Sequence, residues 1–490
     1  MPISDVRKPS IKINFVLNFL RVFSAAIVGL LTMPYISRVL GAEYLGKVEY
    51  VFTIINYFVL FSALGIPMYG IREVSKKRNN VRELYKLVYE LYLILFITTV
   101  ISYIIILIMI NLSVFANYRD LIIIMSAMVF LSNIGAEWYF QGVENQKFIT
   151  IRYIAVRFFV FILIFLLIKK SEDYRIYAFL LVVLGFGANI INFVFLSFNL
   201  YKQKIKLKDL NLLKHLKPIF TIFLATVSIN IYLQLDNFLI GSISGDKFVG
   251  YYAMANKLIR YSISFITVIG SVMLPRLSFL FLNDRSQYDS YLKKSLHLMM
   301  ILSIPCSAYF FIFSNNIISF MGGSEFEPAM LTMQILSPLC IIVSIAYFFG
   351  FLILYPQGLE KIYTKATFFS AIFSVVINFY FIKHYQQNGA AVIAVLSELL
   401  AVLFMFYYLN NMNLINNLFD KNFIKILIIN TSLFFLFYIA LYKNNILVET
   451  SYFLIVSLAY LVSYLLLLFF FKEHNVYNII NKALLTLSKK

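Results

Sequence analysis

The chain has 490 residues, of which 61% are hydrophobic and only 13% are charged, and its mean hydropathy is +0.84. Soluble globular proteins carry about a quarter charged residues, so this composition excludes a fold whose surface faces mostly water. The formal charge of +19 suits either a nucleic-acid surface or basic loops on one side of a membrane, and the positions of the charges decide between them.

Apolar segments long enough to cross about 30 Å of hydrocarbon follow one another along the whole chain. They predict about fourteen transmembrane helices and an all-α polytopic membrane fold. In chain order the predicted segments are 11–33, 48–68, 84–112, 120–140, 150–168, 176–200, 218–241, 250–274, 293–321, 329–355, 363–382, 389–409, 423–442 and 447–471. No connection between them is long enough to fold as a separate soluble domain.

Lys and Arg gather in alternate connections between these segments. With both termini on one side of the membrane, most of the 42 Lys and Arg lie on that side, Lys147 and Arg152 among them. The positive-inside rule therefore predicts cytoplasmic termini. Basic runs such as 202–208 are interpreted as topology anchors that can also touch anionic lipid headgroups, and no nucleic-acid partner is expected. Residues 1–10 are polar and precede no small-residue cleavage site, so we expect no cleavable signal peptide.

The chain contains an internal repeat. Gly41-Ala-Glu-Tyr-Leu-Gly46, after the first segment, returns as Gly245-Asp-Lys-Phe-Val-Gly250, after the seventh. Gln141-Gly142-Val143-Glu144, after the fourth segment, returns as Gln357-Gly358-Leu359-Glu360, after the tenth. The glycines of the first motif are expected to form a tight turn between helices.

An even number of predicted helices separates the copies, so the copies run in the same direction as parallel repeats. We therefore predict an N-lobe at 1–200, a cytoplasmic linker at 201–217 and a C-lobe at 218–410. Residues 411–490 are predicted to add the last two helices and a cytoplasmic tail. Two parallel six-helix lobes around a central cavity favour transport over enzymatic chemistry.

Four basic residues lie well inside predicted helices: Arg21, Arg157, Lys257 and Arg260. A charge in hydrocarbon is costly, so such a residue either faces a polar cavity or extends to the headgroups. Arg157 lies two turns from the cytoplasmic end of its segment, and both alternatives remain open for it.

Polar residues accompany these cations at helical spacing, which predicts a shared wet interior. The stripes comprise Asn14, Asn18, Arg21, Ser24 and Thr32 in the first segment, and Lys257, Arg260, Tyr261, Ser264, Thr267 and Ser271 in the eighth. Hydroxyl side chains also pack between membrane helices, which explains the Ser and Thr residues but not the arginines.

Three acidic residues are notable among those within or at the ends of predicted helices. Asp236 lies near the outer end of its segment, and Glu137 is expected to cap or anchor its helix at the cytoplasmic face. Glu398 lies near the middle of the segment 389–409. It is expected either to carry a coupling proton or to pair with a basic residue, and both alternatives stay open.

Catalytic, cofactor and metal sites are not indicated. The sequence 41–47 matches the glycine and lysine positions of a phosphate-binding loop, but Val48 replaces the required Ser or Thr. The four His lie in or near connections without metal-ligand spacing, and Cys306 and Cys340 lie in apolar segments. We predict no enzyme, no catalytic residues, no cofactor and no bound metal.

Several short motifs, taken in order, resemble those of bacterial polysaccharide flippases of the Wzx type, also called O-antigen transporters. The motifs are Pro34-Tyr-Ile-Ser-Arg38, Leu40-Gly41-x-x-Tyr44-Leu-Gly46, Leu64-Gly65-Ile66-Pro67-x-Tyr69-Gly70-Ile-Arg72-Glu73, Trp138-Tyr139-Phe140-Gln141-Gly142, Gln234-Leu-Asp236 before Gly241, and Gly250-Tyr251-Tyr252-x-x-Ala255-x-Lys257-Leu258. The resemblance covers essentially the whole chain.

This resemblance implies membership of the multidrug/oligosaccharidyl-lipid/polysaccharide exporter superfamily. The implied function is lipopolysaccharide or capsule polysaccharide biosynthesis, by moving undecaprenyl-pyrophosphate-linked oligosaccharide repeat units between leaflets of the bacterial cytoplasmic (inner) membrane by alternating access. Its implied partners are this substrate, membrane lipids, the polysaccharide polymerase machinery and a coupling H+ or Na+, with an ion gradient or the membrane potential as energy source. A lipid II flippase and a cation-coupled multidrug exporter of the same superfamily remain alternatives.

A pyrophosphate in a cleft needs cationic partners, and arginine suits bidentate phosphate contacts. The residues expected to bind substrate are Arg21, Lys257 and Arg260, then Arg157, Asn18 and Tyr261. The residues expected to couple an ion are Glu398 and Asp236.

Overall fold

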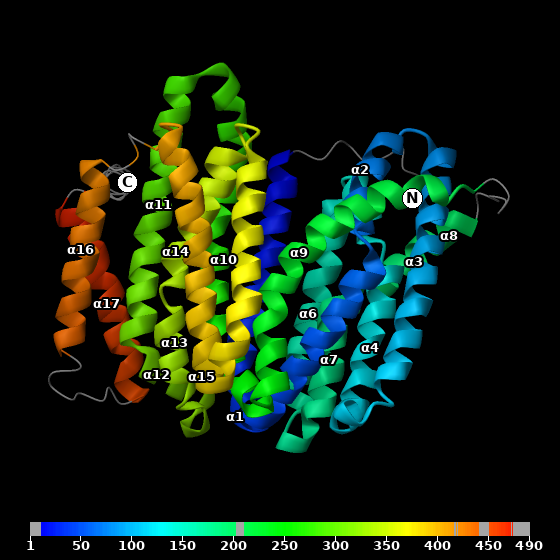
Figure 1. The fold of residues 1–490 in the computed structure, drawn as a ribbon, viewed down its shortest axis with the longest axis horizontal. Coiled ribbons are helices and arrows are strands. Elements are labelled where there is room, and N and C mark those ends of the chain that lie inside the picture. The colour runs from blue at the N-terminus through cyan, green and yellow to red at the C-terminus, as the bar shows by residue number, and fades with distance from the viewer. Residues whose placement is uncertain are drawn as a thin grey trace, which may run out of the picture. The chain divides into compact units, whose positions relative to one another are not determined.

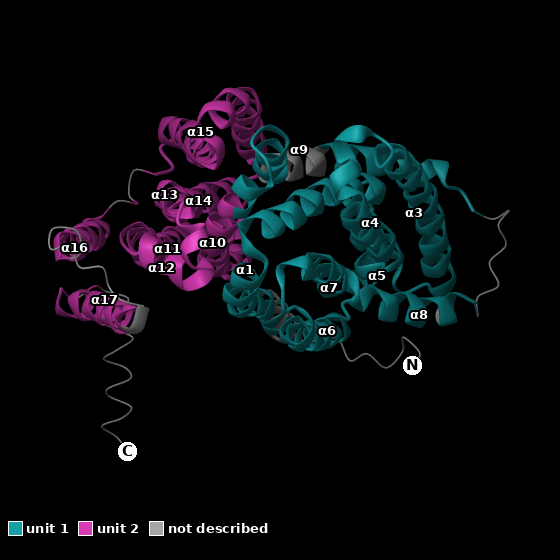
Figure 2. Ribbon diagram, turned by 90° about the horizontal axis from the view of Figure 1, so that it is seen from below, with its two compact units in different colours: residues 1–250 teal, residues 251–490 magenta. Residues whose placement is uncertain are grey.

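The computed structural model describes residues 11–201, 210–415, 418, 420–440, 450–471 and 473. Within the helices, the side chains of residues 11–15, 18, 22, 199, 225–233, 450 and 451 are not described. The described residues contain helices and no strand, which confirms the all-α prediction (Figure 1). The chain divides into two compact units, Met1–Gly250 and Tyr251–Lys490, which Figure 2 colours separately.

The N-terminal unit contains nine α-helices and two short 3-10 helices among its described residues, together with the first turn of a tenth α-helix. They are α1 (Ile11–Ala63), α2 (Ile66–Lys77), α3 (Val81–Met109), η2 (Ser113–Tyr118), α4 (Arg119–Ile134), α5 (Glu137–Gly142), α6 (Gln146–Leu167), η3 (Ser171–Asp173), α7 (Tyr174–Phe186), α8 (Ala188–Tyr201), α9 (Leu213–Ile243) and the start of α10 (Asp246–Asn283).

The C-terminal unit continues with the rest of α10. Its other described elements are α11 (Arg285–Ile312), α12 (Ser314–Gly322), η5 (Ser324–Phe326), α13 (Ala329–Leu336), α14 (Leu339–Tyr347), the π-helical turn η6 (Phe348–Leu354), α15 (Glu360–Asn411), α16 (Lys421–Tyr438) and α17 (Thr450–Phe470).

The helices agree with the predicted membrane segments. Among the described residues, ten helices are long and apolar enough to cross a membrane, and the pair α7 and α8, bent by 45°, makes an eleventh. Two long helices each cover two predicted segments, because α1 is kinked at Gly41 and α15 at Gln386. With α9 over the predicted segment 218–241, each predicted segment overlaps a helix.

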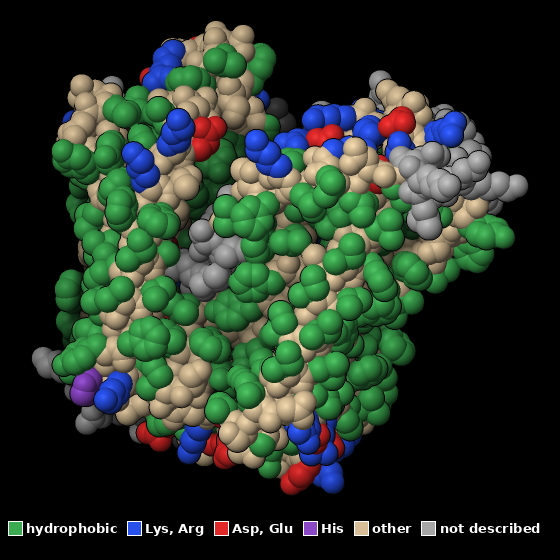
Figure 3. Space-filling model, turned by 45° about the vertical axis from the view of Figure 1, so that its right-hand side comes forward, with side chains coloured by type: hydrophobic (Ala, Val, Ile, Leu, Met, Phe, Trp, Pro, Cys, Tyr) green, Lys and Arg blue, Asp and Glu red, His purple; other side chains and the backbone are tan. Residues whose placement is uncertain are grey.

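The surface of these helices is apolar along most of its length. Large side chains such as Phe96, Ile108 and Phe158 are more than half exposed, which suits contact with lipid tails rather than water. On the face drawn in Figure 3, hydrophobic side chains cover the middle of the helices and charged side chains gather at the helix ends. The protein is therefore a multi-pass membrane protein.

The first repeated motif forms a helix crossing inside the N-terminal unit. Gly41 and Gly245 both have positive φ, 74° and 104°, so each ends one helical stretch and starts the next. A Cβ on Gly46 would lie 1.8 Å from the carbonyl oxygen of Asp246, and one on Gly250 would lie 2.1 Å from that of Ala42. The two motif copies therefore contact each other through equivalent positions, at a distance that only glycine allows.

The two copies of the second repeated motif align differently by backbone conformation than by sequence. Gly358 has φ of 71°, and in the first copy the residue with positive φ is Glu144, at 61°. The residue after each of them donates its N–H, at 2.9 Å, to the carbonyl five residues earlier. Glu144 is thus the structural counterpart of Gly358, whereas the matching letters pair Gly142 with Gly358. The predicted lobe boundaries remain a prediction.

Candidate functional site

A break between α4 and α5 shapes the interior of the N-terminal unit. Ala136 has a left-handed conformation with φ of 38°, which is strained for a residue with a side chain. The break frees backbone carbonyls that would otherwise bond within a helix, and side chains of α8 satisfy two of them. Asn189 donates its side-chain amide to the Leu131 carbonyl at 3.0 Å, and Asn192 donates to the Gly135 carbonyl at 2.7 Å. Such interrupted helices occur in membrane proteins where the backbone lines a cavity.

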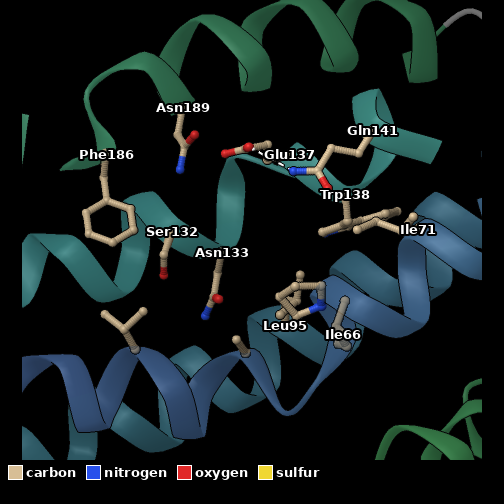
Figure 4. Close-up of a pocket in the computed structure, with 13 residues that line it drawn as sticks. Ile66, Ile71, Leu95, Ser132, Asn133, Glu137, Trp138, Gln141, Phe186 and Asn189 are labelled. Carbon is tan, nitrogen blue, oxygen red and sulfur yellow. Dashed lines mark hydrogen bonds between the residues drawn. The ribbon is translucent and has the colours of Figure 1, made fainter. Parts of the chain in front are cut away.

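A cavity of about 280 Å³ lies at this break. Its apolar wall comes from α1, α2, α3, α7 and Trp138 of α5, and its polar wall comes from Ser132, Asn133, Glu137, Gln141 and Asn189. Figure 4 shows Glu137 between Gln141 and Asn189 along one side of the cavity. The cavity therefore presents one carboxylate and several amides to its interior.

Glu137, the first residue of α5, forms an ion pair with Arg21 of α1. The Glu137 carboxylate also accepts a hydrogen bond of 2.9 Å from the side-chain amide of Gln141. The Arg21 and Glu137 side chains are 23% and 25% exposed. The sequence prediction that Glu137 only caps or anchors its helix was incomplete, because its partner lies 116 residues away along the chain.

Arg157 joins this group from α6. Its Nη1 donates to the Arg21 carbonyl at 2.7 Å and to the Ser24 Oγ at 3.1 Å. Its guanidinium lies 4.6 Å from the centre of the Tyr153 ring, and that of Arg21 lies 5.5 Å from the same ring. These distances suit cation–π contacts. Tyr153 therefore holds the two predicted cations Arg21 and Arg157 close together.

Arg152 is more deeply buried than a topology charge in a connection would be. It is only 5% exposed and lies six residues into α6, about 9 Å along the helix axis, and its predicted cytoplasmic side remains a prediction. Its guanidinium nitrogens have no hydrogen-bond partner among the described residues. The guanidinium lies 5.5 Å from the centre of the Phe140 ring and 5.2 Å from that of the Phe148 ring.

We call Arg21, Arg152, Arg157, Glu137 and Tyr153 the N-terminal cationic cluster. Arg152 interacts electrostatically with Glu137 and Arg21, so the cluster is one electrostatic unit with three cations and one carboxylate. The sequence could have indicated Arg152 as a cation inside a membrane helix, since the residue falls inside the predicted segment 150–168.

In the C-terminal unit, Arg260 of α10 and Glu398 of α15 face each other, with 3.7 Å between the guanidinium and carboxylate atoms. Their side chains are 31% and 13% exposed. Lys257 and Tyr261 lie on α10 one turn before and one residue after Arg260, and both are half-buried. This distance fits the alternative in which Glu398 pairs with a basic residue.

The remaining predicted residues belong to the N-terminal unit. Asp236 is half-buried in α9 and interacts electrostatically with Tyr57 of α1. The side chain of Asn18 lies outside the described residues.

A second charged centre went unnoticed in the sequence. Glu90 of α3 is fully buried and lies 2.8 Å from both Lys214 Nζ and His215 Nε2. It also accepts the Asn211 backbone N–H at 2.9 Å, and Tyr69 hydrogen-bonds the other ring nitrogen of His215 at 2.6 Å. Within the described residues no group of His, Cys, Asp and Glu has the arrangement of a metal site. This centre therefore ties the first turn of α9, and Asn211 just before it, to α2 and α3.

Comparison with known families gives two matches. The family model described as "Polysaccharide biosynthesis protein" matches residues 11–281, and the model named MatE matches residues 221–382. A curated relative from Escherichia coli (strain K12), named "Putative O-antigen transporter", is 23% identical over 387 residues, which cover 79% of this chain and 93% of the relative.

Comparison with solved structures shows the fold. A structure titled "Lipid II flippase MurJ, inward closed conformation" matches with a TM-score of 0.73 and 16% identity, over 93% of this chain and 98% of that one. An inward-facing multidrug resistance MATE family transporter of the MOP superfamily matches with a TM-score of 0.58 and 12% identity, over 79% of this chain and 98% of that one. The all-α transporter architecture is common to these proteins.

Proposed function

The chain belongs to the polysaccharide biosynthesis protein family, as a flippase of the MOP superfamily, and on that premise we propose that it moves undecaprenyl-pyrophosphate-linked oligosaccharide repeat units across the bacterial inner membrane. It is a transporter rather than an enzyme. The proposed direction is from the cytoplasmic to the outer leaflet by alternating access, with both termini in the cytoplasm. Repeat units of an O-antigen type are favoured because relatives from Escherichia coli and Shigella dysenteriae are named "Putative O-antigen transporter".

The N-terminal cationic cluster carries this proposal. It sets three guanidinium groups against one carboxylate among helices that face lipid. Arginine in apolar surroundings binds phosphate oxygens strongly, because its planar fork makes two parallel hydrogen bonds and water does not compete. An excess of buried cations suits an anionic headgroup and repels a cationic drug.

The proposed headgroup contacts are Arg21, Arg157 and Asn18 of the N-terminal unit, and Lys257, Arg260 and Tyr261 of the C-terminal unit. The cavity at the α4–α5 break offers amides and hydroxyls, which are the groups that hydrogen-bond sugars. The isoprenoid tail stays in the bilayer in this proposal, so the protein moves only the polar part of the substrate.

The proposed coupling residues are Glu398 and Asp236. Glu398 lies beside Arg260, so a proton or Na+ that binds Glu398 would change the charge next to a proposed headgroup contact. An ion gradient or the membrane potential is the proposed energy source, and the polysaccharide polymerase machinery is the proposed recipient of the flipped unit.

Two other transport functions within the superfamily are each favoured by one observation. The structural match to a lipid II flippase keeps a peptidoglycan precursor as second candidate substrate, although that likeness concerns the fold alone. The MatE match over 221–382 keeps a cation-coupled drug exporter as third.

The test is a deletion strain scored for surface polysaccharide and for lipid-linked repeat units in the inner leaflet. We expect the polymer to disappear and the lipid-linked units to accumulate, and we expect Arg21→Ala and Arg260→Ala to restore less than a tenth of the export. The matched control is Arg175→Ala, because Arg175 pairs with Asp120 on the exposed surface at 2.7 Å. Normal polymer together with sensitivity to cationic dyes would contradict the proposal in favour of a drug exporter, and arrested peptidoglycan synthesis would favour a lipid II flippase.

A further inference from the structure

Arg152 of the N-terminal cationic cluster is buried, and its three guanidinium nitrogens have no hydrogen-bond partner among the described residues. A charged group in apolar surroundings costs several kcal/mol unless it is paired, so buried arginines are normally bonded on more than one nitrogen. Among the described residues, Arg152 contacts the rings of Phe140 and Phe148 and interacts electrostatically with Glu137. Its burial therefore makes sense if an anion completes the cluster during the working cycle.

Glu137 is the carboxylate that neutralises part of this cluster. It holds Arg21 directly, and its field also reaches Arg152. A carboxylate resembles part of a phosphate, since both offer two oxygens to the fork of a guanidinium. Glu137 thus occupies a position in which a phosphate group of a ligand would make the same contact.

The surroundings of Glu137 allow it to leave Arg21. It starts the six-residue helix α5, directly after the strained Ala136, and it borders the cavity of about 280 Å³. Within that cavity Gln141 already donates to it at 2.9 Å, and Asn133 and Asn189 line the same space (Figure 4). A displaced Glu137 therefore keeps hydrogen-bond donors without remaining bound to Arg21.

We propose that Glu137 takes the place of the substrate's anionic group before the substrate binds, and that the pyrophosphate of the lipid-linked substrate displaces it and pairs with Arg21 and Arg152. This inference rests on the proposed function and adds two residues, Glu137 and Arg152, to the site. The exchange couples substrate binding to the position of α5, because Glu137 is part of that helix.

The chain supplies its own reporter for this exchange. Trp138 is the one tryptophan of the sequence, and it follows Glu137 directly in α5. It is buried, with its ring against Tyr92 and against Gly70, where a Cβ would lie 2.6 Å from the indole. A displacement of Glu137 changes the surroundings of the indole, so intrinsic fluorescence follows binding without a label.

The experiment titrates the purified full-length protein in detergent with farnesyl pyrophosphate and follows Trp138 fluorescence. We expect saturable binding of farnesyl pyrophosphate and none of farnesol. Glu137→Gln keeps the size and the neutral hydrogen bonds but removes the competing charge, so we expect at least fivefold tighter binding. Arg152→Gln should weaken binding at least tenfold, and Arg152→Lys, which keeps the charge but loses the fork, should lie between.

The matched control is Glu144→Gln. Glu144 lies in the turn after α5 and pairs with the exposed Arg78 at 2.7 Å, so the substitution removes one negative charge nearby without touching the cluster. Binding should stay within twofold of the original protein. Thermal unfolding of each variant verifies that it is folded. If Arg152→Gln does not fold, Arg152→Lys alone tests the role of Arg152.

Three outcomes would overturn the inference. Glu137→Gln could bind no tighter than the original protein, or both Arg152 variants could bind unchanged. Phosphatidylglycerol could compete as well as farnesyl pyrophosphate, which would make the cluster a site for ordinary bilayer headgroups. If any of these occurs while the deletion strain still accumulates lipid-linked units, the proposed function stands and only the exchange of Glu137 fails.

Discussion

Single glycines decide how closely two helices approach in the N-terminal unit. Gly46 and Gly250 occupy equivalent positions in the repeated motif, and each faces a backbone carbonyl of the other copy. A methyl group at either position would overlap main-chain atoms, which cannot rotate away as a side chain can. Small residues at such crossings are the common way in which membrane helices gain van der Waals contact.

Gly46→Ala tests this crossing. The new Cβ would lie 1.8 Å from the Asp246 carbonyl oxygen, so the helices must separate, and we expect destabilisation of about 1–3 kcal/mol. Thermal unfolding of the purified protein in detergent measures it. Gly185→Ala is the matched control, because nothing lies within 4 Å of its added Cβ, and it should leave the transition unchanged or raise it. Equal unfolding temperatures for both variants would contradict the proposed crossing.

Among the secondary-structure elements, the interrupted helix α4–α5 is the one that creates the candidate site. An uninterrupted helix would have no free carbonyls, no cavity beside Glu137 and no reason for the amides of α8 to point at it. The Asn192 amide supplies one of the replacement hydrogen bonds, at 2.7 Å to the Gly135 carbonyl, and is fully buried.

Asn192→Ala should destabilise the N-terminal unit by about 1–3 kcal/mol, because it leaves the Gly135 carbonyl without a donor in a site that water does not easily reach. The readout is the same thermal transition, combined with export in the complemented deletion strain. Asn283→Ala provides the comparison, since Asn283 is exposed and donates to Phe279 of its own helix. The interpretation of the break would be wrong if the two variants behaved alike.

The charged centre around Glu90 connects α3 to the segment that enters α9. Removing the carboxylate leaves Lys214 and the buried His215 without their shared acceptor. We expect Glu90→Ala to cost about 3–5 kcal/mol, since one partner of a buried ion pair is lost. Glu83→Ala, also on α3, removes an exposed pair with Lys77 and should cost less than about 1 kcal/mol. Limited proteolysis between α8 and α9 would report the loosened segment, and unchanged cleavage in Glu90→Ala would refute this role.

For the whole molecule, the distribution of Lys and Arg predicts which ends of the helices face the cytoplasm. In a chain without Cys306 and Cys340, single cysteines at Arg78 and at Glu172 should react from opposite sides of the membrane. A membrane-impermeant maleimide added to intact cells should label the cysteine at position 172 and not the one at position 78. The reverse pattern would place both termini outside.

The amino-acid sequence by itself determined the all-α class, the order of the apolar segments and the existence of a repeated glycine motif. These properties are local, because an apolar stretch of sufficient length must satisfy its backbone within a helix and glycine adopts a positive φ without steric strain. The sequence also selected Arg21 and Arg260 as unusual, since an arginine inside an apolar segment needs a reason.

Only the tertiary structure decided which charges meet. Arg21 finds Glu137 across 116 residues, and Glu398 finds Arg260, pairings that no spacing in the chain encodes. The burial of Arg152 near a helix end likewise depends on Phe140 and Phe148, which fold over it. The free energy of a charge depends on the groups and the solvent around it rather than on its place in the sequence, and neighbouring helices supply those groups.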